Sequence, residues 1–182
     1  GRTSYVVDQD GNLWAAGENR WGQMGLRYSA ANPQSGWTQI MDSGDVAAAA
    51  GSAGTLYILK ANGSLWYAGQ GGVIELRQVT GLDAVAAIDS SVRQTAVLTV
   101  GGTLYLSDTE EPSRFTRQAG RVKNFCFNSN GLIWVTEENQ ICSQYSMGQT
   151  PDTWIWDGQG VTPDFAVYDI AVDASGLLLL DT

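Results

Sequence analysis

The amino-acid sequence predicts an all-β fold, a β-propeller of about four to five four-stranded blades in a single repeat domain over residues 1–182. Three observations predict it. Short runs of Val, Ile, Leu, Tyr and Trp alternate with turns rich in Gly, Asp and Asn, which is typical of half-buried strands. A hairpin of strand, glycine turn and strand recurs along the chain. The turn glycines Gly11, Gly63 and Gly101 lie 52 and 38 residues apart, and a period of roughly 35 to 50 residues is typical of propeller blades.

The hairpins are clearest in two copies, DGNLWAAG at residues 10–17 and NGSLWYAG at residues 62–69. Each copy follows an alternating apolar run, at residues 4–7 and at residues 55–60. Asp-Gly and Asn-Gly are expected in such tight turns because these turns require positive φ angles. Three looser copies follow, at residues 95–106, at residues 131–142 and, with its first strand alone, at residues 176–180.

Two further kinds of strand are expected between the hairpins. Strands with amide or basic residues are expected at residues 37–40, 76–79 and 115–118. Strands of small residues are expected at residues 46–50 and 85–88, with bulkier counterparts at residues 122–127 and 165–172. Small residues suit the crowded space near a propeller axis, so these are predicted to be the innermost strands. A short helix is the alternative because alanine favours helices, but runs that end at Gly51 and Ser90 are too short for a stable helix.

The composition excludes several classes of partner. The net charge is −9 and the basic residues are scattered, so nucleic-acid binding is not expected. The longest apolar runs, residues 46–50 and 84–88, are too short to cross a bilayer, and no membrane insertion is expected. Without histidine, Cys126 and Cys142 lack the extra ligands of a structural zinc site, and no cofactor or metal is predicted. Both cysteines lie in apolar runs, which favours two buried thiols over a disulfide.

The sequence favours a protein without catalytic activity. Serine–histidine and cysteine–histidine mechanisms require a histidine, and the chain has none. The carboxylate pairs Glu110-Glu111 and Glu137-Glu138 are adjacent in sequence, so in a strand their side chains would point to opposite faces. These pairs are therefore poor candidates for joint acid–base chemistry.

Two polar stretches match the motif of a site but are favoured as turns. The stretch that starts at Asp8 has Asn19 where an EF-hand loop carries its bidentate glutamate, and its Asp-Gly pair is expected to join two strands. The stretch Asn62-Gly63-Ser64 matches a glycosylation acceptor, and Asn-Gly is also the strongest turn dipeptide.

The first hairpin and the segment after it resemble the regulator of chromosome condensation repeats. The resemblance rests on DGNLW at residues 10–14, GEN at residues 17–19 and GQMG at residues 22–25. In the second copy it extends to Gly69, and later copies keep only the rhythm of strands. The resemblance implies a propeller that acts as an exchange factor for small GTPases, as an enzyme inhibitor or as an interaction module. Family propellers usually have seven blades and often a histidine in the hairpin, so this chain is expected to be a smaller ring, a part of a larger one or a divergent relative.

The candidate contact residues lie in the two longest irregular stretches, residues 18–36 and 143–162. Trp, Tyr and Arg are the usual anchors of protein interfaces. Trp21, in a loop, is the first candidate for an exposed contact. Trp154 and Trp156 are expected either to contact a partner or to pack on neighbouring blades, and Trp37, which opens a strand, is expected to pack. The candidates are Arg20, Trp21, Tyr28, Tyr145, Trp154 and Trp156.

These observations predict a non-enzymatic, protein-binding β-propeller module that recognises a protein partner through its end loops. Histone and DNA binding are not expected because the chain has no basic surface stripe. The alternative is a receptor-binding or glycan-binding knob of a larger viral or cell-surface assembly. A carboxylate-based glycosidase or lyase ranks third.

Overall fold

The computed structural model describes residues 3–25, 34–70, 73–127, 131–145, 162–172 and 177–181, and these residues are nearly all in strands and turns. Among them, no helix has the length and apolar character needed to cross a membrane. The strands are β1 (Thr3–Val7), β2 (Leu13–Gly17), β3 (Gln34–Met41), β4 (Val46–Ser52), β5 (Thr55–Lys60), β6 (Leu65–Gly69), β7 (Val73–Gln78), β8 (Val85–Ser90), β9 (Thr95–Thr99), β10 (Leu104–Ser107), β11 (Phe115–Ala119), β12 (Val122–Phe127), β13 (Gly131–Thr136), β14 (Ile141–Tyr145), β15 (Val167–Val172) and β16 (Leu177–Asp181).

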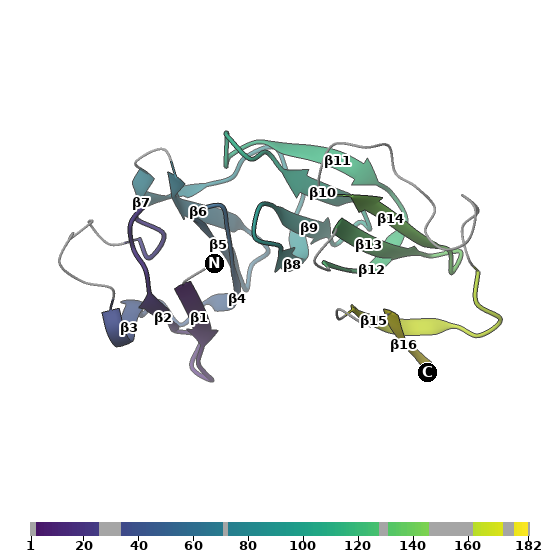
Figure 1. Ribbon diagram of the computed structural model, residues 1–182, viewed down its shortest axis with the longest axis horizontal. Coiled ribbons are helices and arrows are strands. Elements are labelled where there is room, and N and C mark those ends of the chain that lie inside the picture. Colours follow the sequence, from purple (N-terminus) through teal and green to yellow (C-terminus); the bar gives the residue numbers. More distant parts are fainter. Residues whose placement is uncertain are drawn as a thin grey trace.

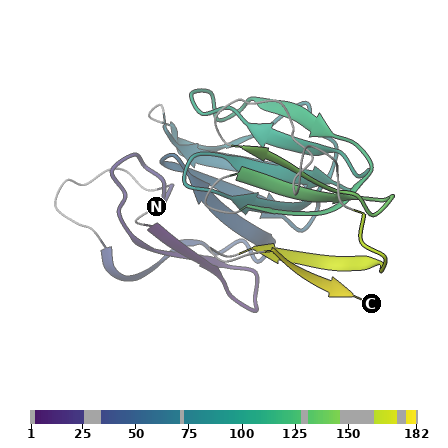
Figure 2. The same cartoon turned by 45° about the vertical axis from the view of Figure 1, so that its right-hand side comes forward.

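The described strands form five sheets, in the orders β1-β2-β3, β4-β5-β6-β7, β8-β9-β10-β11, β12-β13-β14 and β15-β16. We call them blades 1 to 5. The blades follow one another along the chain, with blades 1 and 5 at the two ends of the array (Figures 1 and 2). Blades 2 and 3 have the four antiparallel strands that the repeat predicts.

The strands of small residues are the innermost strands, as predicted. β4 and β8 each lie at one edge of their sheet and contact each other, and β8, β12 and β15 continue the series. The alternative of a short helix is therefore wrong. Several predicted boundaries also shift: β3 and β7 begin earlier than predicted, at Gln34 and Val73, β4 and β8 end two residues later, and β15 begins at Val167.

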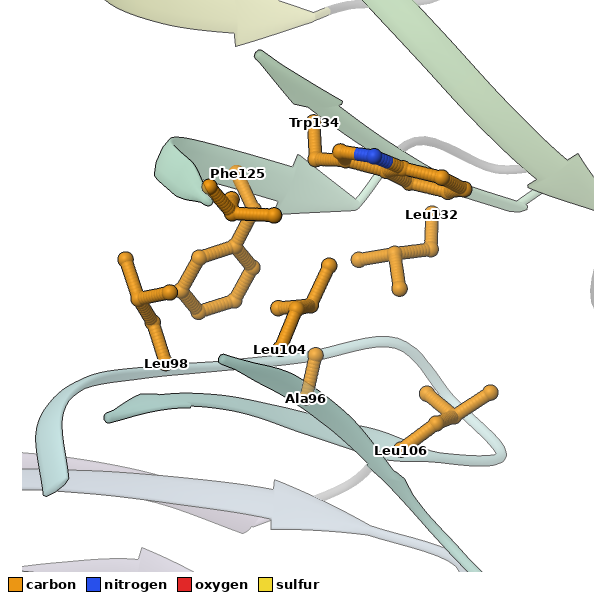
Figure 3. Close-up of a cluster of buried hydrophobic side chains, with 8 residues drawn as sticks. Ala96, Leu98, Leu104, Leu106, Phe125, Leu132 and Trp134 are labelled. Atoms are coloured by element: carbon orange, nitrogen blue, oxygen red, sulfur yellow. The ribbon is translucent and has the colours of Figure 1, made fainter. Parts of the chain in front are cut away.

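The hydrophobic core lies between the blades. Alternate residues of the second strand of a blade face opposite neighbours, so Leu56 and Ile58 pack toward blade 1 while Tyr57 and Leu59 pack toward blade 3. Figure 3 shows the equivalent cluster between blades 3 and 4, where Leu98 and Leu104 face Phe125, Leu132 and Trp134. Blades 2, 3 and 4 hide both faces because a neighbouring blade covers each of them.

A recurring hydrogen bond joins each blade to the next. The first inner-strand valine donates its N–H to the carbonyl oxygen of the turn glycine in the preceding blade, from Val46 to Gly11 at 3.1 Å, from Val85 to Gly63 at 2.9 Å and from Val122 to Gly102 at 2.9 Å. These glycines have φ angles of 76°, 82° and 76°, which explains the Asp-Gly, Asn-Gly and Gly-Gly turns. At the fourth junction Asn139 takes the place of glycine at φ 66°, and its Oδ1 accepts from the Val167 N–H at 2.9 Å.

Each described inner strand also contains a β-bulge after its first valine. The register shifts between Val46 and Ala48 in β4, and equivalent shifts occur in β8, β12 and β15. The extra residue at this point is exposed in all four strands: Ala47, Ala86, Lys123 and Tyr168. Bulges increase the local twist and bend a strand, so the repeated bulge curves every inner strand in the same way.

The two cysteines are free thiols on opposite faces of blade 4, as the sequence favoured. Cys126 packs in the cluster that faces blade 5, and Cys142 packs in the cluster that faces blade 3. Both are half-buried. Burial raises the pKa of the Cys126 thiol to about 12, with smaller contributions from the charges of Asp89 and Asp169.

Candidate binding site on the Trp21 face

The candidate site lies at one end of blades 1 to 3. It is formed by residues 18–25 after β2, by the turn at Ala53 and Gly54 between β4 and β5, and by residues 91–94 between β8 and β9. We call this surface the Trp21 face. The turns at residues 8–12, 61–64 and 100–103 lie at the opposite ends of the same strands.

The amide side chains of Asn19 and Gln23 hold the segment at residues 18–25 in its conformation. Asn19 Oδ1 accepts from the backbone N–H of Met24 at 2.9 Å, and Met24 is fully buried. Gln23 is buried as well, and its Oε1 accepts from the backbone N–H of Trp21 at 2.7 Å. The Asn and Gln of the GEN and GQMG motifs therefore act as scaffold, and they fix the position of Trp21.

Trp21 joins blade 1 to blade 2 while it remains exposed. A Cβ atom added to Gly54 would lie 2.9 Å from Trp21 Cδ1, so the indole ring rests on the glycine turn between β4 and β5. The side chain of Trp21 is nevertheless 59% exposed. An aromatic ring that is fixed on one side and open on the other is well suited to bind a partner.

An open pocket of about 240 Å³ lies beside Trp21, between blades 1 and 2. Trp21, Tyr5 and Val92 supply apolar surface, and Glu18, Ser52 and Thr55 supply polar groups. Val92 comes from the β8–β9 turn and is 72% exposed. The pocket and the two exposed apolar side chains thus extend across three successive blades.

Tyr5 forms a closely packed and uncharged part of the pocket lining. The Tyr5 ring lies against Gly51, where an added Cβ atom would be 2.7 Å from Tyr5 Cε2. Tyr5 donates its hydroxyl to the Gln23 carbonyl at 2.6 Å, and burial raises the pKa of this phenol, so it stays protonated at neutral pH. No group of three or more Cys, Asp or Glu side chains that could hold a metal ion occurs among the residues that the structure describes.

The stretch that starts at Asp8 forms the β1–β2 turn, at the end of the strands opposite the Trp21 face. Asp8 Oδ1 accepts from the backbone N–H groups of Asp10 and Asn12 at 3.0 and 2.9 Å, and Asp8 Oδ2 accepts from the Trp14 indole at 2.9 Å. The Trp14 hydrogen bond is the largest cause of a lowered pKa at Asp8. This carboxylate holds the β1–β2 hairpin together, in agreement with the turn interpretation.

The glycosylation motif also forms a turn. Asn62 Oδ1 accepts from the backbone N–H of Ser64 at 3.0 Å and from its hydroxyl at 2.7 Å. Asn62 itself is exposed.

The structure brings together two of the predicted contact residues. Arg20 is exposed next to Trp21 on the Trp21 face. Tyr145 is the last residue of β14, and its side chain is outside the described part. Tyr28, Trp154 and Trp156 lie outside the described residues. Trp37 differs from its prediction, since it is 52% exposed on β3 of blade 1.

Sequence reasoning missed the other members of the Trp21 face. Val92 lies in a polar turn, and a single valine there carries no signal of a site. Ala53, at φ 46°, is exposed in a tight turn that the sequence does not mark with the usual dipeptide. The proximity of these residues to Trp21 depends on the stacking of blades, which pattern analysis of one segment does not reveal.

Comparisons with known proteins identify the fold class. No family model and no curated protein sequence matches the chain. Among solved structures, Prp20p from Saccharomyces cerevisiae superposes with a TM-score of 0.75 at 17% identity, over 100% of this chain and 53% of that one. Yeast RCC1 (Prp20) bound to Kap60 gives a TM-score of 0.76 at 12% identity, over 100% and 52%. Human WBSCR16 gives 0.67 at 14% identity, over 79% and 45%.

The chain therefore has an RCC1-like β-propeller fold, and it spans about half the length of these structures. At such low identity the likeness concerns the fold alone. For the yeast protein, the structure was described together with its binding to Gsp1p and histones, and a second structure shows it bound to Kap60.

Proposed function

We propose that this chain is a non-enzymatic protein-binding module and that the Trp21 face binds the partner. The observation that carries the proposal is Trp21 itself, which is fixed by Gln23 and by contact with Gly54 yet is 59% exposed beside an open pocket. Trp and Arg are enriched at the centres of protein interfaces, and Arg20 and Arg93 are exposed on the same face. The propellers that this chain resembles in fold include one whose known partners are proteins.

The test compares two exposed valines at opposite ends of the same strand. Val92 precedes β9 on the Trp21 face and is 72% exposed, whereas Val100 follows β9 at the opposite end and is 74% exposed. Peptides selected from a displayed library against the whole chain are titrated against the variants Trp21→Ala, Val92→Ala and Val100→Ala. The loss of a central anchor costs about 2 kcal/mol or more, so Trp21→Ala weakens binding roughly thirtyfold.

Val92→Ala is expected to weaken binding less than Trp21→Ala, and Val100→Ala is expected to leave it unchanged. Urea unfolding of each variant checks that the fold is retained. Equal binding by Trp21→Ala and the unchanged chain, with both folded, would refute the proposed site.

Glycan binding is the second candidate function, and one observation favours it. The polar residues Thr3, Ser52 and Thr55 line the pocket beside the exposed indole, and aromatic rings stack on sugars. A glycan array probed with the chain and with Trp21→Ala separates the two functions. Binding to a defined glycan that Trp21→Ala abolishes would favour the glycan-binding knob over the protein-binding module.

A further inference from the structure

The turn between β5 and β6 contains the pair Asn62-Gly63, which lies at the junction between blades 2 and 3. Its glycine carbonyl accepts the hydrogen bond from the Val85 N–H at 2.9 Å. Among the junctions that the structure describes, this is the one with asparagine directly before the junction glycine, because Asp10 and Gly101 hold that position in blades 1 and 3. Asn62 is exposed, so its side-chain amide is accessible to water.

An asparagine that precedes glycine places an electrophile and a nucleophile on adjacent residues. The backbone nitrogen of Gly63 can attack Cγ of the Asn62 side chain, because glycine has no Cβ that blocks the approach. A bond forms between this nitrogen and Cγ, the bond from Cγ to Nδ2 breaks, and the side-chain nitrogen leaves as ammonia with the proton of the Gly63 N–H. Water then opens the resulting five-membered imide ring at either carbonyl, which gives aspartate or isoaspartate.

The folded turn keeps both reacting groups in other hydrogen bonds. The Gly63 N–H donates to the Lys60 carbonyl at 2.9 Å, and the nitrogen must lose this proton before it can attack. Asn62 Oδ1 accepts from the Ser64 N–H at 3.0 Å and from the Ser64 hydroxyl at 2.7 Å, which fixes the orientation of the side-chain amide. Ring closure breaks these hydrogen bonds, so the turn must open first.

The inner strand of blade 3 packs against the turn and makes its opening less favourable. Gly63 has φ 82°, and an added Cβ atom would lie 3.0 Å from the Ala84 Cβ. Val85 is buried, and its N–H loses its acceptor when Gly63 moves. A buried donor without a partner is unfavourable. The rate of reaction at Asn62 therefore depends on how often the junction between blades 2 and 3 opens.

We propose that Asn62 is a site of spontaneous deamidation that the folded junction restrains and whose product weakens the same junction. The isoaspartate product adds one carbon atom to the backbone directly before Gly63. The N–H and C=O groups of Gly63 are then displaced from their partners on Lys60 and Val85. A brief opening thus becomes a lasting change in the junction. The turn lies at the end of the strands opposite the Trp21 face, so this proposal is independent of the proposed function.

The first experiment follows deamidation in the whole chain by mass spectrometry of protease digests. The chain is kept at pH 8, either folded or unfolded in urea, and the peptide that contains Asn62 is quantified for the replacement of NH by O. Deamidation is expected to be at least about tenfold slower in the folded chain. Ser64→Ala removes the hydroxyl that bonds to Asn62 and is expected to raise the folded-state rate severalfold, whereas Ser64→Thr retains a hydroxyl and should not. Neither variant should change the rate in urea.

The second experiment measures the effect of the product on the junction. The isoaspartate form is purified by anion exchange and compared with the variant Asn62→Asp, which has the same charge and an ordinary backbone. The isoaspartate form is expected to unfold at lower urea and to show faster hydrogen exchange in β8. Asn62→Asp should resemble the unchanged chain, because its carboxylate still accepts from the Ser64 N–H.

Three results would overturn the proposal. The first is the absence of deamidation at Asn62 in the unfolded chain, which would remove the site. The second is an equal rate in the folded and unfolded chains, which would show that the junction does not restrain the reaction. The third is an isoaspartate form as stable as Asn62→Asp, which would show that the product leaves the junction intact.

Discussion

The substitution Gly11→Ala tests the junction between blades 1 and 2. Gly11 has φ 76°, and an added Cβ atom would lie 2.7 Å from the Gly44 carbonyl oxygen and 2.8 Å from its carbonyl carbon. Real Cβ atoms do not approach backbone so closely, so the two turns must separate. The separation stretches the 3.1 Å hydrogen bond from the Val46 N–H to the Gly11 carbonyl, and Val46 is buried.

Two contributions determine how much Gly11→Ala lowers the free energy of unfolding. An alanine in the left-handed region costs about 1–2 kcal/mol wherever it is placed. A buried N–H group that loses its partner costs a further 1–3 kcal/mol or so. Gly81→Ala isolates the first contribution, because Gly81 has φ 82° and no atom lies within 4 Å of its added Cβ. Gly63→Ala should fall between them, since its added Cβ would lie 3.0 Å from the Ala84 Cβ at the same φ of 82°.

Urea unfolding followed by tryptophan fluorescence measures the free energy of unfolding of each variant. Gly11→Ala is expected to lower the free energy of unfolding by about 2 kcal/mol more than Gly81→Ala, which corresponds to roughly 4–8 °C in melting temperature for a chain of this size. The slope of the unfolding free energy against urea should not change between variants. If the three variants are equally stable, glycine is needed at these turns only for its positive φ angle, and the reasoning about the junction is wrong.

Three further predictions concern the turns and the thiols. Asn139→Ala is expected to lower the free energy of unfolding, measured in urea, by roughly 2–4 kcal/mol, because alanine keeps the unfavourable φ of 66° and leaves the Val167 N–H without its acceptor. Asn139→Gly should lower it by less than half as much, since a glycine carbonyl accepts the equivalent bond at the other junctions. The pKa of Asp8 is lower in the folded protein than in the unfolded chain, so Asp8 stabilises the fold fully above its unfolded-state pKa and loses this effect as pH falls through its folded-state pKa. Acidification below about pH 4 should therefore destabilise the unchanged chain more than the Asp8→Ala variant. Because Cys126 and Cys142 are free thiols, the protein should have the same intact mass with and without reductant, and a mass lower by two hydrogens without reductant would contradict this. Both thiols should react slowly with a thiol reagent at pH 8 until urea is added, because burial raises the pKa of each.

The repeat allowed the fold to be predicted from local sequence. The Leu-Trp hairpins predicted β1-β2 and β5-β6, and the alanine runs predicted β4 and β8, because each signal lies within a few residues of sequence. The bulge after the first inner valine could not be predicted in this way. It depends on how the strand pairs with its neighbour, and Ala47 and Lys123 at the bulge share no residue type.

The candidate site was predicted only in part for the same reason. Trp21 could be chosen because an aromatic residue between Arg20 and Gly22 in a loop is a local anomaly. Val92 lies 71 residues further along the chain and reaches the site only because blade 3 follows blade 2 around the axis. Trp37 was predicted to pack because it lies in a strand, and its exposure depends on which blades surround it.

The direction of the junctions explains how blade 1 is held in place to present the Trp21 face. Each junction runs from the turn of one blade to the inner strand of the next, so the bond between Val46 and Gly11 links the first turn of blade 1 to the inner strand of blade 2. Blade 1 is thus held to blade 2 at both ends and in the middle: by this bond, by Leu13 in the cluster with Leu56, and by the Trp21 ring on Gly54. A loosened Gly11 junction should therefore also disturb the pocket at the far end of the same interface, although no atom of Gly11 touches it.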